Sequence, residues 1–278
     1  MFSDILTPLT GLGVPFDILE KEGPVVSTPI RSMDAVRRMR PLVPGEAVPY
    51  AGAALTALRA ELAGTDAAVL GFVGAPFTLA TYCVEGGTTS SYLNIKKMAF
   101  GEPAILHALL ERLTDGVIEY VRYQADAGAH VVQIFDSWGC NLSPCDWDVF
   151  SGPYIKRIVD EVKRTHPRLP LILYASGSGG MLERMGATGV DCVSVDQNVD
   201  IADARKRLGA DKAVQGNLDP AWLFASHDFI RARVDQVAAR AGGTKHVMNL
   251  GHGVMPSTPE ANVAAFFEAA RTVHERRK

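Results

Sequence analysis

The sequence predicts an α/β fold, a (β/α)8 TIM-type barrel, from three observations. Apolar runs recur along the chain, helix-sized segments separate them, and each run ends in a polar or glycine-rich corner. The seven runs cover residues 1–6, 68–82, 131–139, 171–180, 191–196, 213–220 and 246–253. Such a series is typical of a parallel barrel, whose strand ends converge on one mouth that holds the chemistry.

Composition favours one soluble globular domain spanning residues 1–278. The chain is 47% hydrophobic and 21% charged, which supplies a core without any apolar run of membrane length. A net charge of -3 and a pI near 6.2 argue against nucleic acid as a partner, because nucleic-acid-binding domains carry a basic face. We also expect no membrane partner.

Periodicity and capping residues place the elements between the runs. Residues 23–32, GPVVSTPIRS, alternate and are expected to form a small hairpin or arm. Helices are expected over residues 32–40, 46–63 and 102–127, from Ser143–Pro144 to His166–Pro167, and after Thr258–Pro259.

The four cysteines form no C-x-x-C pair and no metal-like spacing with the histidines, so we expect reduced thiols and no metal site. Cys192 lies within an apolar run and is expected in the core, whereas Cys140 and Cys145 flank a helix start and are expected to be partly exposed. A closed barrel needs eight parallel strands. Only seven runs are visible and Met1 opens inside one, so we expect an N-terminal truncation that removes the first strand and arm.

Two corners in the N-terminal half carry candidate site residues. Asp4 lies near the end of the first run, where a carboxylate at the barrel mouth stabilises positive charge; the alternative is that it caps the following turn. Tyr82 ends the second run, before Glu85 and two glycines. Its phenol can donate one directed hydrogen bond to a ligand, or its ring can simply close the end of the barrel.

Two further corners carry Ser137 and His252. Ser137 can donate to a substrate carboxylate or cap its turn, and strand alternation sends neighbouring Asp136, a second carboxylate candidate, to the opposite face. His252 stands between Gly251 and Gly253, a poor site for a packed histidine and a good one for reaching an anionic ligand. No dinucleotide or phosphate-binding spacing, Schiff-base lysine or serine-triad elbow appears.

The segments FSDIL, GFVGAPFTLATYCVEGG, QIFDSW, LPLILYASGSGG, AVQGNLDP and NLGHG, taken together and in this order, resemble the uroporphyrinogen decarboxylase family, in its plastid and cyanobacterial-like branch. The resemblance covers essentially the entire chain. It implies a (β/α)8 barrel that forms homodimers and uses no cofactor or metal. It also implies cofactor-free decarboxylation of the four acetate side chains of uroporphyrinogen III to coproporphyrinogen III, in haem and chlorophyll biosynthesis.

The resemblance also implies roles for the four corner residues. Asp4 would contact the pyrrole nitrogens of the tetrapyrrole substrate, while Tyr82, Ser137 and His252 would bind its carboxylate-bearing periphery. Arg31 matches a family position too, although a surface or arm role fits it better. Two departures stand out: the family's arginine-bearing RQAGR segment before FSDIL is not in this sequence, and Gln197–Asn198 replace a common Trp-Thr pair.

Two other functions remain open on sequence grounds. One is an inactive or truncated tetrapyrrole-binding paralogue. The other is a zinc- and corrinoid-dependent methyltransferase of the same superfamily, although no H-x-C motif is present to supply its ligands. The resemblance implies the chloroplast stroma if the source is a plant or alga, and the cytoplasm otherwise.

Overall fold

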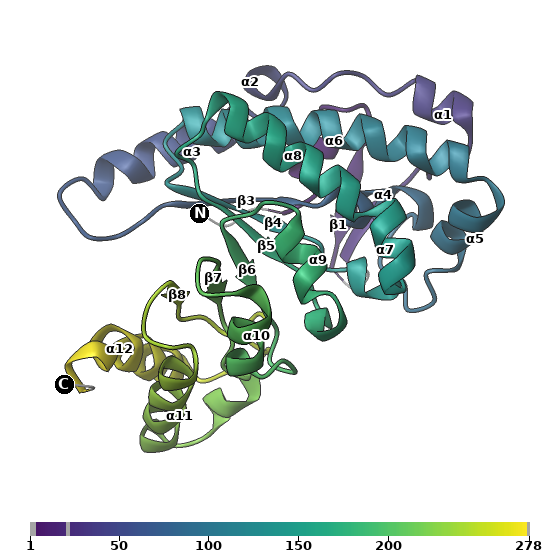
Figure 1. The fold of residues 1–278 in the computed structure, drawn as a ribbon. Coiled ribbons are helices and arrows are strands. Elements are labelled where there is room, and N and C mark those ends of the chain that lie inside the picture. The colour runs from purple at the N-terminus through teal and green to yellow at the C-terminus, as the bar shows by residue number, and fades with distance from the viewer. Residues whose placement is uncertain (1–3, 21–22, 277–278) are drawn as a thin grey trace. The chain divides into compact units, whose positions relative to one another are not determined.

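The computed structural model describes residues 4–20 and 23–276, with the side chains of 274–276 excepted (Figure 1). The chain divides into two compact units. The first comprises Met1–Leu173 and Thr188–Val190, and the second comprises Tyr174–Ala187 and Asp191–Lys278.

The strands of the first unit form a hairpin and the start of a parallel sheet. They are β1 (Phe16–Leu19), β2 (Gly23–Val26), β3 (Leu70–Gly74), β4 (Val131–Phe135) and β5 (Leu171–Tyr174), the last of which ends at the first residue of the second unit. β1 pairs antiparallel with β2, so the expected hairpin is confirmed. β3 pairs parallel with β4, with Leu70 opposite Val131. All four residues of β5 are buried, as expected for a parallel strand covered on both faces.

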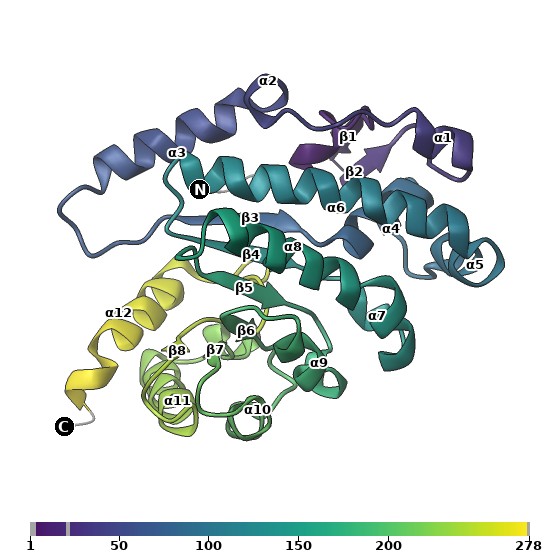
Figure 2. The same ribbon diagram turned by 45° about the horizontal axis from the view of Figure 1, so that its top comes forward.

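Helices pack on the parallel strands of this unit and on one another. They are α1 (Met33–Arg37), α2 (Pro44–Ala47), α3 (Pro49–Glu61), α4 (Pro76–Glu85), α5 (Leu93–Gly101), α6 (Pro103–Asp126), α7 (Pro144–Phe150) and α8 (Gly152–Thr165), with short 3-10 turns at Thr7–Leu9 and Gly139–Asn141. The long helix α6 runs beside α8 along β3 and β4 in both views (Figures 1 and 2). Its apolar stripe is completely buried, with Leu106, Leu110, Leu113 and Val117 each 0% exposed, so the helix expected over 102–127 is confirmed.

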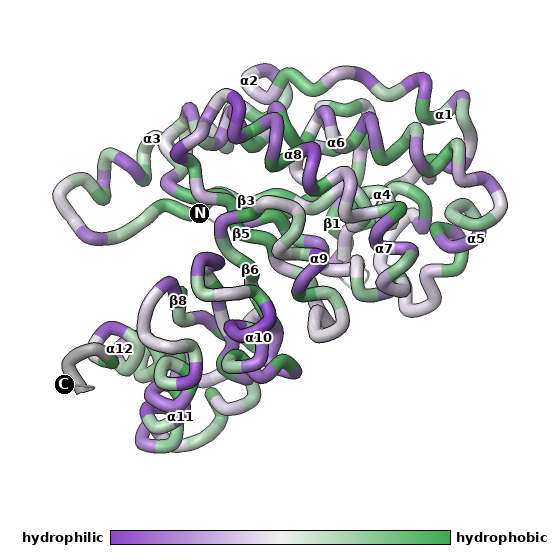
Figure 3. Tube along the Cα trace, in the orientation of Figure 1, coloured by the Kyte–Doolittle hydropathy of each residue, from purple (hydrophilic) through white to green (hydrophobic). Residues whose placement is uncertain are grey.

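The second unit repeats the strand–helix alternation. Its strands are β6 (Cys192–Ser194), β7 (Ala213–Gln215) and β8 (His246–Val247), and its helices are α9 (Leu182–Ala187), α10 (Ile201–Leu208), α11 (His227–Arg240) and α12 (Glu260–Arg276), with 3-10 turns at Ser178–Gly180 and Pro220–Phe224. β7 pairs parallel with both β6 and β8. The β6 strand is hydrophobic, whereas α10 and α11 carry many hydrophilic residues (Figure 3).

Two strand predictions are wrong in part. Of the run at 1–6, residues 1–3 lie outside the described residues, and residues 4–6 form no strand but lead through a turn into a 3-10 helix. The run at 68–82 is a strand only as far as Gly74, because Pro76 begins α4. Tyr82 therefore lies on a helix.

The other boundaries agree with expectation in most places. The helix predicted from Ser143 is two helices, because α7 ends before Ser151 and α8 begins at Gly152, followed by a proline without a backbone donor. The final helix after Thr258–Pro259 is confirmed. Cys192 is buried and Cys140 and Cys145 are exposed, as expected. The single domain over residues 1–278 stays a prediction. Within residues 4–20 and 23–276, no helix has the length and apolar character needed to cross a membrane.

Candidate active site

Asp4 lies at the start of the described chain and is half-buried. Its Oδ1 accepts a 2.8 Å hydrogen bond from the backbone N–H of Leu6, and its carbonyl accepts from the N–H of Thr7 at 3.1 Å. The side chain therefore caps its own turn, which was the alternative left open by the sequence. Among the described residues Oδ2 has no hydrogen-bond partner, so the carboxylate keeps one oxygen available for a ligand.

Tyr82 lies in the last turns of α4 and is half-buried. Burial, the negative charge of Asp4 and then the neighbouring Tyr92 phenol raise the pKa of Tyr82 to about 12. The phenol therefore keeps its proton near neutral pH and remains a hydrogen-bond donor.

Two neighbouring polar residues in the corner after β4 differ in burial. Asp136 is 0% exposed, whereas Ser137 is half-buried. Ser137 is followed by Trp138, whose ring stacks on Tyr82 with centroids 3.9 Å apart. The Ser137 corner therefore lies beside α4, next to the Tyr82 ring.

Asp136 acts as a structural acceptor inside the first unit. Its Oδ2 accepts from Trp147 Nε1 at 2.9 Å and from Ser151 Oγ at 2.7 Å, and its Oδ1 accepts from Thr78 Oγ1 at 3.1 Å. Burial raises the pKa of Asp136, and these three hydrogen bonds oppose that rise. The Asp136 carboxylate is completely buried and already accepts three hydrogen bonds, so it does not face a ligand.

His252 belongs to the second unit and is exposed. Its Nδ1 lies 2.8 Å from the backbone N–H of Gly253, a contact in which Nδ1 accepts. The proton of the neutral ring is then on Nε2, which leaves Nε2–H as the donor toward solvent or a ligand. Its ring also meets Tyr174 edge-on, with centroids 6.4 Å apart.

Close backbone packing holds the loop that carries His252. A Cβ atom placed on Gly251 would overlap the backbone N of Gln197, so only glycine fits there. Gln197 Oε1 is buried and has no hydrogen-bond partner among the described residues. Gln197, one of the two residues that depart from the family's common pair, therefore lies directly against the His252 loop.

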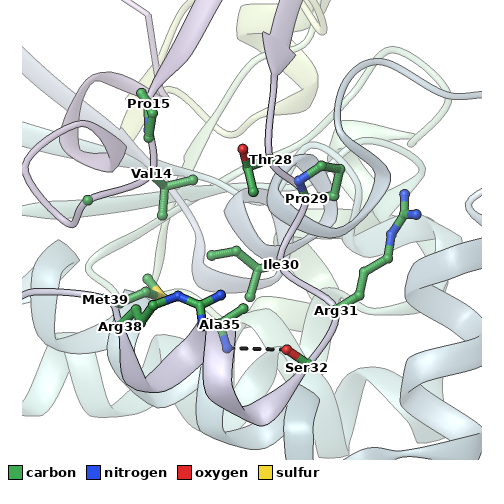
Figure 4. A pocket seen from close by; sticks show the side chains of 11 residues that line it. Val14, Pro15, Thr28, Pro29, Ile30, Arg31, Ser32, Ala35, Arg38 and Met39 are labelled. Atoms are coloured by element: carbon green, nitrogen blue, oxygen red, sulfur yellow. Dashed lines mark hydrogen bonds between the residues drawn. The ribbon is translucent and has the colours of Figure 1, made fainter.

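Arg31 is exposed, yet its guanidinium makes a structural hydrogen bond to the main chain. A pocket in the first unit is lined by Val14, Thr28, Ile30, Ser32, Arg38 and Met39. The Arg31 guanidinium extends away from Ile30 and Met39 (Figure 4). It donates from Nε to the carbonyl of Val84 at 2.8 Å, near the end of α4.

The structure thus gathers part of the predicted site. Tyr82 and the Ser137–Trp138 corner lie together in the first unit, which also contains Asp4, and His252 lies in the second. The sequence reasoning missed Thr78 and Trp138, which connect the Ser137 corner to Tyr82. The tryptophan of QIFDSW was the signal that could have pointed to this connection. In residues 4–20 and 23–276 no group of three His, Cys, Asp or Glu side chains is placed to hold a metal ion.

Comparison with known proteins decides the family. The family model described as "Uroporphyrinogen decarboxylase (URO-D)" matches residues 1–273. This chain belongs to the uroporphyrinogen decarboxylase family. The resemblance deduced from the sequence motifs is therefore confirmed.

Plant and cyanobacterial proteins are among the similar members of the uroporphyrinogen decarboxylase family. The chain is 59% identical over 273 residues to "Uroporphyrinogen decarboxylase 2, chloroplastic" of Oryza sativa, which covers 98% of this chain and 70% of the rice protein. It is 54% identical over 275 residues to "Uroporphyrinogen decarboxylase" of Crocosphaera subtropica, covering 99% of this chain and 77% of that protein. Both matches leave part of the relative's length outside the aligned region.

Solved structures confirm the α/β fold of TIM-barrel type. A methyltransferase from Methanosarcina mazei superposes with a TM-score of 0.79 at 21% sequence identity, covering 99% of this chain and 80% of the methyltransferase. Identity at that level shows the shared fold alone.

Proposed function

We propose that this chain is a decarboxylase that converts the four acetate side chains of uroporphyrinogen III into methyl groups, giving coproporphyrinogen III in haem and chlorophyll biosynthesis. The observation that carries the proposal is the family match over residues 1–273, together with 59% identity to a chloroplastic uroporphyrinogen decarboxylase. A half-buried Asp4 carboxylate and a protonated Tyr82 phenol in the same unit support it, because the reaction needs negative charge and hydrogen-bond donors.

The proposed chemistry needs no cofactor, because the substrate supplies its own electron sink. Protonation of a pyrrole carbon next to an acetate makes the ring cationic. The C–C bond to the carboxylate then breaks, carbon dioxide leaves, and the bonding pair neutralises the ring. A proton then adds to the former acetate carbon to complete the methyl group, and the ring carbon releases the proton it took up, which restores the neutral pyrrole.

Asp4 is the proposed catalytic residue. Its carboxylate would lie against the pyrrole nitrogens and stabilise the cationic ring more than the neutral ground state. A carboxylate about 4 Å from such a cation contributes about 4 kcal/mol at an effective dielectric near 20. That energy corresponds to roughly a thousandfold in rate. Oδ2 accepts no hydrogen bond from the described residues, which supports this role, because capping of the turn occupies only Oδ1.

Tyr82, Ser137 and His252 are the proposed substrate-binding residues. The Tyr82 phenol is protonated near neutral pH and can donate to substrate carboxylates. Ser137 is half-buried beside Tyr82, and the exposed His252 presents Nε2–H. Each group can therefore donate to an anionic periphery.

The finer features of the family reading are also proposals. We propose one domain over residues 1–278 that assembles as a homodimer. The named plant relative is chloroplastic, which supports the chloroplast stroma if the source is a plant or alga, and the cytoplasm otherwise.

The direct test is turnover of uroporphyrinogen III under reducing conditions, with separation of the products and measurement of released carbon dioxide. We expect coproporphyrinogen III, with unchanged rates after treatment with a metal chelator. Tetrapyrrole binding without any carbon dioxide release would favour the inactive paralogue instead. Loss of all activity on chelation, restored by zinc, would favour the zinc-dependent alternative.

A further inference from the structure

Trp138 covers one face of the proposed substrate-binding tyrosine. Its ring stacks on Tyr82 with centroids 3.9 Å apart and an interplanar angle of 29°. The Tyr92 ring meets the edge of the same indole at 5.5 Å and 74°. Offset stacking and edge-to-face contact are the favourable geometries of aromatic pairs. The three rings therefore restrict how the Tyr82 side chain can turn.

A buried threonine fixes the backbone of Trp138. The N–H of Trp138 donates to Thr78 Oγ1 at 3.2 Å, and the same hydroxyl donates its proton to Asp136 Oδ1 at 3.1 Å. Thr78 is 0% exposed and lies on α4 four residues before Tyr82. Residues four apart lie on one face of a helix. Helix α4 therefore contacts Trp138 twice: Thr78 binds its backbone N–H, and Tyr82 stacks on its ring.

Asp136, which accepts the hydrogen bond from Thr78, is itself held in place. Asp136 is completely buried and also accepts hydrogen bonds from Trp147 and Ser151. A Cβ atom on Gly139 would overlap the Asp136 carboxylate, so the chain turns tightly around that acid. The corner that carries Trp138 is therefore anchored on α4, α7 and the start of α8.

We propose that Trp138 is a positioning residue for Tyr82: it holds the phenol in one orientation and covers one face of its ring, so that the hydroxyl points toward the substrate. The inference rests on the proposed function, because it assigns a use to the Tyr82 hydroxyl. It gives Asp136 and Thr78 an indirect role, since they fix the backbone from which the indole projects.

The electrostatics of Tyr82 agree with this arrangement. Burial is the largest cause of the rise in its pKa to about 12, ahead of the charge of Asp4 and the Tyr92 phenol. The stacked indole supplies part of that burial. Removing the indole admits water to one face of Tyr82 and lowers its pKa toward the ordinary value near 10.

A double-mutant cycle tests whether Trp138 acts through the Tyr82 hydroxyl. Trp138→Leu is expected to lower kcat/KM about tenfold, since an aromatic pair contributes up to that much. Trp138→Phe, which keeps a stacked ring, is expected to recover most of the loss. In a Tyr82→Phe background, Trp138→Leu should cause little further loss. Equal losses in both backgrounds would overturn the proposal.

A second readout does not depend on catalysis. The tyrosinate absorbance of each protein is titrated, and the same titration of its Tyr82→Phe counterpart is subtracted. We expect a lower midpoint for Tyr82 in Trp138→Leu than in the wild type; an unchanged midpoint would overturn the proposal. If the wild type releases no carbon dioxide, the proposed function fails while this titration still tests the positioning.

Controls separate positioning from general damage. Trp222→Leu removes an indole in the second unit whose ring lies 4.6 Å from the Arg233 guanidinium, and it should leave both readouts unchanged. If Trp138→Leu does not fold, Thr78→Val replaces it, because this change releases the Trp138 backbone but keeps the ring. Thr78→Ser should then restore the wild-type midpoint, and failure of Thr78→Val to shift it would also overturn the proposal.

Discussion

Arg31 Nε donates a 2.8 Å hydrogen bond to the carbonyl oxygen of Val84, which lies 53 residues further along the chain. A second nitrogen of the same guanidinium reaches the Glu85 carbonyl at 3.4 Å. Carbonyls at the C-terminal end of a helix lack intrahelical donors, and the negative end of the helix dipole also stabilises a cation there. The arm after β2 therefore caps α4, the helix that carries Tyr82.

Replacing Arg31 with glutamine should destabilise the protein by about 1 kcal/mol, because the α4 carbonyls lose a charged donor. Arg37→Gln is the matched control, since Arg37 is exposed and, within the described part of the chain, pairs only with exposed Asp34 three residues earlier. Its loss should cost less than about 0.5 kcal/mol. Urea unfolding of the two variants measures the difference, and equal costs would count against the capping role.

Asp136→Asn should destabilise the fold by roughly 1–3 kcal/mol. The amide replaces one acceptor oxygen with a donor group, so one of the donors from Thr78, Trp147 and Ser151 loses its acceptor. Asp66 is exposed, and Asp66→Asn should leave the free energy of unfolding nearly unchanged. Chemical denaturation of both variants checks this prediction.

The cost of Asp136→Asn should also depend on pH. Burial raises the native pKa of Asp136 above its unfolded value, so the native state binds the proton more tightly. The contribution of Asp136 is then fully present below about pH 4 and declines as pH rises through the native pKa. The difference in free energy of unfolding between the wild type and Asp136→Asn should therefore narrow as pH rises. A difference that widens would show that the native pKa of Asp136 is lowered instead.

Gly251→Ala should be far more damaging than Gly253→Ala. A Cβ at Gly251 overlaps the backbone of Gln197, whereas nothing lies within 4 Å of a Cβ at Gly253. Overpacking against backbone costs about 1–3 kcal/mol and would displace His252, which lies between the two glycines. Thermal unfolding, together with KM for uroporphyrinogen, measures both effects; similar behaviour of the two variants would contradict the close packing seen here.

The sequence located most strands but misjudged where one ended. The run from Ala68 to Tyr82 is apolar throughout, and α4 is buried over nearly its whole length, so hydrophobicity does not change at the boundary. Pro76 was the usable signal, because proline suits the first turn of a helix and interrupts a sheet. The break between α7 and α8 carried the same signal in Pro153.

The site was predictable in its residue types and less so in its connections. Asp136 is buried and Ser137 is half-exposed, but both follow the end of β4 at Phe135, so which of them faces the mouth stays a prediction. The turn formed by Asp4 was only one of two options, because a short aspartate can bond its own backbone wherever the chain bends. The path from Asp136 through Thr78 to Trp138 crosses about sixty residues of sequence, and no local pattern encodes such a contact.

The most direct test of the account is carbon dioxide release from uroporphyrinogen III by the Asp4→Asn variant. The amide keeps an oxygen to accept the Leu6 N–H, so the turn and the fold should survive. Asp17→Asn, a change at an exposed aspartate on β1, is the matched control and should behave as wild type. We predict that Asp4→Asn lowers kcat by roughly a hundredfold or more with an unchanged unfolding midpoint. Near-wild-type release by a folded Asp4→Asn protein would contradict the assignment of Asp4 as the group that stabilises the cationic ring.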